Sequence, residues 1–179
     1  GYYDGGLIGL TIKPTHLHIG GAAENEAVRI GNAPDSVTIS KGSGGFNGFT
    51  SGVVSSTTGS LTMTIQNLHM TGVTVNLATL TSLVFAGVES SYITATITLK
   101  NSEFESCKLY KRSDQEKYYG YLFGSPWNGF IHFDGFNILL KDCTTASPSI
   151  FTGEVKNGSY MHLTAVSLVN CSGGARDFY

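Results

Sequence analysis

Charge is scarce in this chain. Asp, Glu, Lys and Arg make up only 13% of its 179 residues, and the formal net charge is −2, whereas an average globular protein is about 25% charged. A near-neutral chain lacks the basic surface with which a nucleic-acid-binding protein displaces counterions, so we expect no nucleic-acid partner. The chain also lacks any run of about 18 apolar residues, so we expect no membrane-spanning helix and no membrane insertion.

Cysteine and proline are also rare. An odd number of cysteines (Cys107, Cys143 and Cys171), without a C-x-x-C pair, predicts neither a disulfide framework nor a zinc cluster. His16 and His18 share one face of a predicted strand over residues 15–19, but no third metal ligand accompanies them. We therefore expect no metal and no cofactor. The 4 prolines are too few for a collagen-like chain.

Glycine, by contrast, is abundant, and helix signals are nearly absent. The chain has 23 glycines, about twice the usual share. Thr, Ser, Val and Ile recur with a period of two, which is typical of half-buried β-strands. The clearest strands are predicted over residues 61–67, 95–101, 136–142 and 164–170.

These four segments align without gaps on their last residue. Two and four places before it, every segment has an apolar residue, so one face of each predicted strand is buried. The last residue is short and polar and can adopt a left-handed turn conformation. The residue after it points inward again, which places Cys143 and Cys171 in one inward column. The four last residues are Asn67, Asn101, Asp142 and Asn170.

This repeat of strand, polar turn and strand, at spacings of 34, 41 and 28 residues, is typical of a solenoid with insertions. It resembles the right-handed parallel β-helix of the pectate-lyase-like superfamily, over about residues 26–175. The resemblance implies an all-β solenoid of about five or six coils, in which Asn67, Asn101, Asp142 and Asn170 stack as an asparagine ladder. An antiparallel sandwich or jelly roll is the competing architecture, since it also has many short strands and glycine-rich turns.

We expect one domain over residues 1–179. The chain begins at Gly1 and carries no signal peptide, which fits either a processed product or a piece of a longer protein. The longest gap between ladder positions predicts an excursion from the solenoid wall over residues 108–134.

Charges and aromatic residues gather in and around this excursion. Residues 100–117 hold nine of the 24 charged residues, and residues 104–136 hold ten of the 20 aromatic residues. Aromatic faces beside charged hydrogen-bonding groups fit a sugar ring. The alternative is that the aromatic residues pack into a mini-core of their own or against another subunit. The candidate ligand-binding residues are Lys100, Arg112, Tyr118, Tyr119, Tyr121 and Trp127.

Two glutamates are the candidates for catalysis. Glu103 and Glu105 point outward on one predicted strand, about 6.5 Å apart, and hydrolysis of a glycosidic bond uses two carboxylates separated by about 5–9.5 Å. The same alignment places Lys100 and Lys141 in one outward column, where an acidic sugar could lie between them. The alternative is that both glutamates simply pair with nearby Lys or Arg side chains. The chain carries no catalytic signature of the superfamily.

The hypothesis that we favour is a non-enzymatic recognition or adhesion module that binds a cell-surface glycan. The resemblance extends to bacteriophage tailspikes and bacterial surface adhesins, which implies a place in a virion tail or at the cell surface. It also implies a homotrimer, or a continuation into a longer chain, that covers the open ends of the solenoid. One alternative is a polysaccharide lyase or glycoside hydrolase that acts on an acidic polysaccharide. The other is a purely structural β-helical shaft or spacer.

Overall fold

The computed structural model describes the strands and the connections next to them. The described residues are 2–4, 6–8, 15–19, 28–30, 37–40, 46–50, 53–54, 59–75, 80–89, 93–109, 123–126, 129–145, 151 and 158–173. Side chains are described at 60–75, 82–85, 88, 94–109, 129–145, 151 and 158–173. Within these residues every regular element is a β-strand, and every pairing is parallel. The prediction of an all-β chain is therefore confirmed, and antiparallel pairing is absent from this part of the chain.

The strands lie in three sheets. The five-stranded sheet contains β1 (Tyr2–Asp4), β5 (Val37–Ser40), β10 (Val73–Val75), β14 (Lys108–Leu109) and β17 (Thr144–Thr145). The six-stranded sheet contains β2 (Gly6–Ile8), β6 (Phe46–Thr50), β7 (Val53–Val54), β11 (Leu80–Thr81), β12 (Phe85–Glu89) and β15 (Phe123–Pro126). The seven-stranded sheet contains β3 (Thr15–Ile19), β4 (Val28–Ile30), β8 (Gly59–Gln66), β9 (Leu68–Thr71), β13 (Ile93–Glu105), β16 (Phe130–Lys141) and β18 (Tyr160–Val169).

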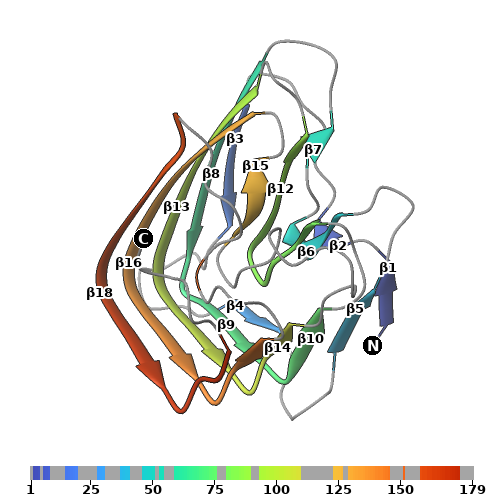
Figure 1. Ribbon diagram of the computed structural model, residues 1–179, viewed down its shortest axis with the longest axis vertical. Coiled ribbons are helices and arrows are strands. Elements are labelled where there is room, and N and C mark those ends of the chain that lie inside the picture. The colour runs from blue at the N-terminus through green and yellow to red at the C-terminus, as the bar shows by residue number, and fades with distance from the viewer. Residues whose placement is uncertain are drawn as a thin grey trace.

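The chain visits these sheets repeatedly in the same order. After β1 in the five-stranded sheet come β2 in the six-stranded sheet and β3 in the seven-stranded sheet, and β5 then starts the next pass beside β1. Figure 1 shows the result for the seven-stranded sheet, in which β3, β8, β13, β16 and β18 lie side by side although residues from the other sheets separate them along the chain.

The inner faces of the three sheets share one core. In β8, β13 and β16 the residues Met63, Ile97 and Phe133 pair in register, and all three are fully buried. Val73 of β10 and Phe85 of β12 belong to the same buried cluster. The two-residue period that predicted these strands therefore separates buried apolar side chains from outward polar ones.

Each pass through the seven-stranded sheet bends at two corners, five residues apart, where the backbone has a positive φ. The first corner is formed by Asn67 (φ 54), Asn101 (47), Asn137 (53) and Ala165 (55). The second corner is formed by Gly72 (φ 63), Ser106 (53), Asp142 (52) and Asn170 (51). Asn, Asp and Gly occupy this left-handed region more readily than other residues, because a short polar side chain or a missing Cβ lowers its steric cost.

Hydrogen bonds between the passes continue through the corners. The Asn67 N–H donates to the Lys100 carbonyl at 3.0 Å, and the Asp142 N–H donates to the Val169 carbonyl at 2.8 Å. Side chains stack as well: Asn137 Nδ2 donates to Asn101 Oδ1 at 3.1 Å. One corner further on, Asn170 Nδ2 donates to Asp142 Oδ1, also at 3.1 Å. Amide stacking therefore occurs in both corner columns.

The structure corrects the register of the predicted ladder. Asn67 and Asn101 do share a column, because β8 and β13 pair at the predicted offset of 34 residues. However, β16 pairs with β13 at an offset of 36 residues rather than 41, so Asn137, and not Asp142, follows Asn101. The predicted stacking of Asp142 on Asn101 is wrong, and the four residues belong to two columns. The error equals the five-residue spacing between the corners, which superimposes one corner on the other.

The predicted excursion over residues 108–134 contains parts of three strands. β14 is the pair 108–109, β15 covers 123–126, and β16 begins at Phe130. The remainder of the segment, including Arg112, Tyr118, Tyr119, Tyr121 and Trp127, lies outside the described residues.

Candidate functional site

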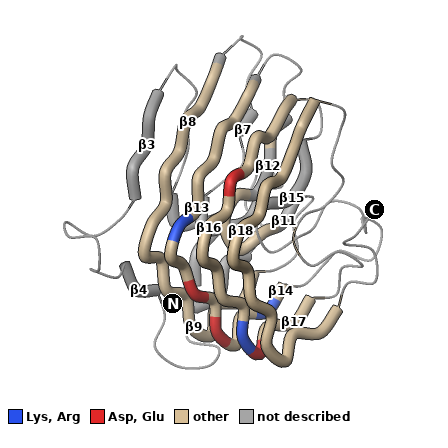
Figure 2. The backbone as a smooth tube through the Cα atoms, turned by 90° about the vertical axis from the view of Figure 1, so that its left-hand side faces the viewer, with Lys and Arg blue, Asp and Glu red and all other residues tan. Residues whose placement is uncertain are grey.

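The outer face of the seven-stranded sheet holds the polar side chains that can be assessed as a site. Figure 2 looks onto this face and shows few charged residues over most of it, with charges gathered near the bend of the strands. In β16 the residues alternate between buried and accessible until Phe136 and Asn137, which are both exposed. The first corner falls at Asn137, so Leu139 and Lys141 take the partly accessible positions beyond it.

A groove of about 260 Å³ lies at this first corner. It is lined by His69, Asn101, Ser102, Glu103, Asn137 and Leu139. The register explains why these residues meet, since Glu103 lies between His69 on one side and Leu139 on the other. The groove therefore combines a carboxylate, an imidazole, two stacked amides and an aliphatic side chain on neighbouring strands.

Glu103 is the acidic group of the groove. Its Oε2 lies 3.8 Å from His69 Nδ1, and its side chain is 40% exposed, so it can accept hydrogen bonds from a ligand. Ser102 is positioned differently: its hydroxyl donates to the Lys100 carbonyl at 2.8 Å and accepts from the Leu68 N–H at 3.3 Å. Ser102 thus fixes the floor of the groove, where it ties neighbouring passes of the chain together.

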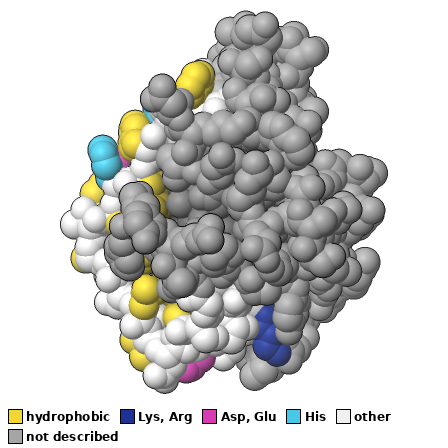
Figure 3. Space-filling view, viewed as in Figure 1, with side chains coloured by type: hydrophobic (Ala, Val, Ile, Leu, Met, Phe, Trp, Pro, Cys, Tyr) yellow, Lys and Arg dark blue, Asp and Glu magenta, His cyan; other side chains and the backbone are white. Residues whose placement is uncertain are grey.

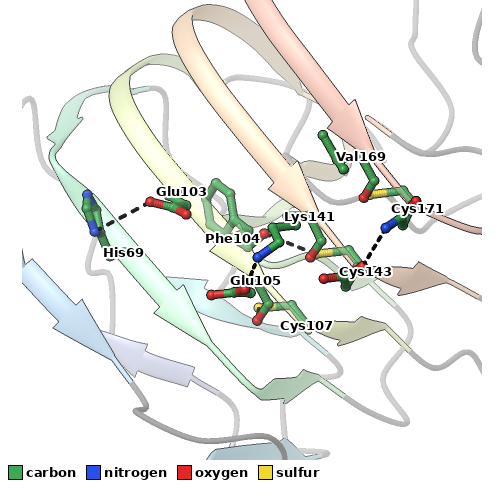
Figure 4. A network of polar contacts seen from close by, with 11 residues as sticks. His69, Glu103, Phe104, Glu105, Cys107, Lys141, Cys143, Val169 and Cys171 are labelled. Carbon is green, nitrogen blue, oxygen red and sulfur yellow. Dashed lines mark hydrogen bonds and ion pairs between the residues drawn. The ribbon is translucent and has the colours of Figure 1, made fainter.

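Glu105 is engaged in an ion pair. Lys141 Nζ lies 2.5 Å from Glu105 Oε1, and this contact is drawn together with the pair His69–Glu103 in Figure 4. The hydrogen bond and charge of Glu105 raise the pKa of Lys141 above its ordinary value of 10.5. The expectation that the glutamates find nearby partners is thus confirmed for Glu105.

The predicted column of Lys100 and Lys141 is wrong. Lys100 pairs in register with Gln66 and Phe136, whereas Lys141 pairs with Glu105. The cause is again the five-residue error in the alignment. Lys100 is exposed on the outer face, but it has no lysine neighbour there, so the proposed anion between two stacked lysines loses its basis.

A second group of side chains lies further along the same face, before the corner. His132 of β16 and Tyr160 of β18 stack with ring centroids 4.5 Å apart, and Tyr160 stacks on His162 at 4.6 Å. His162 Nδ1 lies 3.3 Å from Asp134 Oδ1. Figure 3 shows histidine side chains at the left-hand edge of the molecule, close to exposed hydrophobic ones. We did not predict this group, because the alignment with the 41-residue spacing set 137 and 139, not His132 and Asp134, beside the outward threonines of β13.

The three cysteines form a column on the inner side, after the second corner. Each Sγ donates to a carbonyl of the preceding pass, at 3.3–3.5 Å; the acceptors are Met70, Phe104 and Leu140. Hydrogen bonding to Cys107, together with burial, raises the pKa of the Cys143 thiol, and burial raises that of Cys171. All three are free thiols, and the predicted inward stacking of Cys143 and Cys171 is confirmed (Figure 4).

Comparison of the chain with family models, with curated proteins and with solved structures found no match. Within the described residues, no cluster of three or more His, Cys, Asp or Glu side chains could hold a metal ion. His16 and His18 pair in register with Thr62 and Thr64, but their side chains lie outside the described set. The same part of the chain contains no helix long and apolar enough to cross a membrane.

Proposed function

We propose that this protein is a recognition module with a right-handed parallel β-helix fold, and that it binds a glycan on the outer face of the seven-stranded sheet. The observation that carries the proposal is the groove at the first corner, in which Glu103, the stacked amides of Asn101 and Asn137, and Leu139 lie together. The fixed order in which the chain visits three parallel sheets supports the β-helix.

The chemistry of the groove fits a sugar better than it fits most other ligands. Carboxylate and amide oxygens accept hydrogen bonds from hydroxyl groups, and amide N–H groups donate to them. The aliphatic side chain of Leu139 offers an apolar contact for the C–H face of a ring. The groove is also built on strands, which hold side chains more rigidly than loops do.

A binding role is better supported than catalysis at Glu103 and Glu105. Acid–base cleavage of a glycosidic bond needs two carboxylates that face the same bond and differ in protonation. Lys141 occupies Glu105 at 2.5 Å, and Glu105 does not line the groove with Glu103. We therefore assign Glu103 to ligand binding and Glu105 to a structural ion pair.

The setting that we propose follows from the resemblance. A β-helical glycan-binding module fits a bacteriophage tail or a bacterial surface protein, where it acts as a trimer or as part of a longer chain. In β18 the inward-pointing Leu168 is 39% exposed, and an exposed edge of this kind invites coverage by a further strand or a subunit.

A glycan array with a matched pair of variants tests the proposal. Glu103→Gln removes the charge in the groove, and Glu105→Gln makes the same change two residues away on the same strand, outside the groove. We expect the wild type and Glu105→Gln to bind the same glycans, Glu103→Gln to lose most of the signal, and no variant to release reducing ends. Absence of any bound glycan, or equal signals from both variants, would contradict the proposal.

A further inference from the structure

Four side chains before the first corner form a compact group on the same outer face. Register places His132 beside Tyr160, and Asp134 beside His162. Tyr160 stacks on both imidazoles, with interplanar angles of 15° to His132 and 24° to His162. Together the three rings make a continuous aromatic surface across β16 and β18, which we call the ring platform.

Contacts at its edges hold the platform in place. His132 Nε2 lies 3.1 Å from the Gly158 carbonyl, and His162 Nδ1 lies 3.3 Å from the Asp134 carboxylate. His162 nevertheless keeps 73% of its side chain exposed, while Asp134 is 28% exposed. A flat, accessible surface with fixed polar edges fits the C–H face and the hydroxyl groups of a pyranose ring.

The ring platform and the groove lie along one strand. Between them the outward residue of β16 is Phe136, whose side chain is 41% exposed. From His132 to Leu139 the strand extends at most about 23 Å, and the bend at Asn137 shortens this. The distance is suited to several linked sugar rings and is too long for a single one.

The charges of this face identify the class of glycan. The carboxylates with described side chains on this face or at its corners are Glu103, Glu105, Asp134 and Asp142, and the lysines are Lys100 and Lys141. Lys141 is already paired with Glu105. An acidic polysaccharide would therefore meet an excess of negative charge, which repels it, whereas an uncharged one would not.

We propose that the ring platform is a second binding site for one ring of the same ligand, and that this ligand is a linear, uncharged polysaccharide that lies along β16. The inference rests on the proposed function, because it extends the glycan from the groove to Tyr160. It names the class of the ligand and its direction on the sheet, and it assigns a role to residues beyond the groove.

The test uses an array that carries neutral and acidic glycans, with the full chain as wild type, Tyr160→Ala and Tyr160→Phe. We expect only neutral glycans to bind. Tyr160→Ala should weaken binding about threefold to tenfold, the range for loss of one aromatic stacking partner, and Tyr160→Phe should bind as the wild type does. Affinity for the bound glycan should rise with chain length until the glycan reaches both sites. Circular dichroism checks that Tyr160→Ala remains folded.

The outcomes separate this inference from the proposed function. If only acidic glycans bind, the uncharged class is wrong and the groove is still a glycan site. If Glu103→Gln weakens binding while Tyr160→Ala does not, or if affinity is independent of chain length, the ring platform is not part of the site. If no glycan binds, the proposed function and this inference both fail.

Discussion

Ala165 is an exception among the corner residues, and replacing it should stabilise the protein. It is exposed and adopts φ 55, in a column whose other members are asparagines. Left-handed backbone costs an ordinary L-residue about 1–2 kcal/mol, and asparagine reduces this cost. In Ala165→Asn the new amide would also lie next to Asn137, as Asn137 lies next to Asn101, with Nδ2 donating to Oδ1.

The size of the effect follows from these two contributions. Relief of part of the left-handed cost and one exposed hydrogen bond, together worth about 1–2 kcal/mol, should raise the free energy of unfolding. For a chain of this length each kcal/mol corresponds to about 2–4 °C in Tm. Ala165→Gly should gain less, because it relieves the backbone but adds no amide and increases the entropy of the unfolded chain.

Differential scanning calorimetry of the variants checks this order. Ala165→Val is expected to be less stable than the wild type, since a β-branched residue fits the left-handed region poorly. Thr164→Asn, one residue earlier in the strand and exposed, is the control and should change stability by no more than about 0.5 kcal/mol. Destabilisation by Ala165→Asn, together with tolerance of Ala165→Val, would refute the corner at this position.

Two further predictions concern the inner side of the sheet. A Cβ on Gly135 would lie 2.8 Å from Ile138 Cδ1, so Gly135→Ala should destabilise the protein by about 1–3 kcal/mol through overpacking; an unchanged denaturant midpoint would contradict this. Burial raises the pKa of the Cys171 thiol above its ordinary value of 9.0, so its proton is held more tightly in the folded chain. Stability should therefore decrease as pH rises above 9.0, and Cys171→Ala should reduce this dependence, whereas an identical pH profile for the variant would contradict the assigned burial.

The sequence was sufficient for the strands and for one of the offsets. Alternation of apolar and polar residues identified the inner columns, because burial of one face imposes a period of two. The offset between Asn67 and Asn101 was also predictable, since both are followed by similar strands. The all-β assignment and the pairing of outward Glu103 with His69 depend only on these local patterns.

The register of β16 could not be obtained in the same way. Both corners place a short residue in the left-handed region, so Asn137 and Asp142 are equivalent as local signals. The choice between them depends on the core, where Phe133 must pair with Ile97, and single-strand patterns do not contain that information. The ring platform was missed for this reason, since only the correct register places His132 and Asp134 beside Tyr160 and His162.

The most direct test of the account is an NMR titration of the imidazole side chains in the full chain with a glycan that the array selects. The account places the glycan along β16, so the resonances of His69, His132 and His162 should shift together with a single Kd. His16 and His18 lie in β3, three strands from β16 in the sheet order, and should not shift. Shifts confined to His16 and His18, or no shift at the other three histidines under saturation, would contradict it.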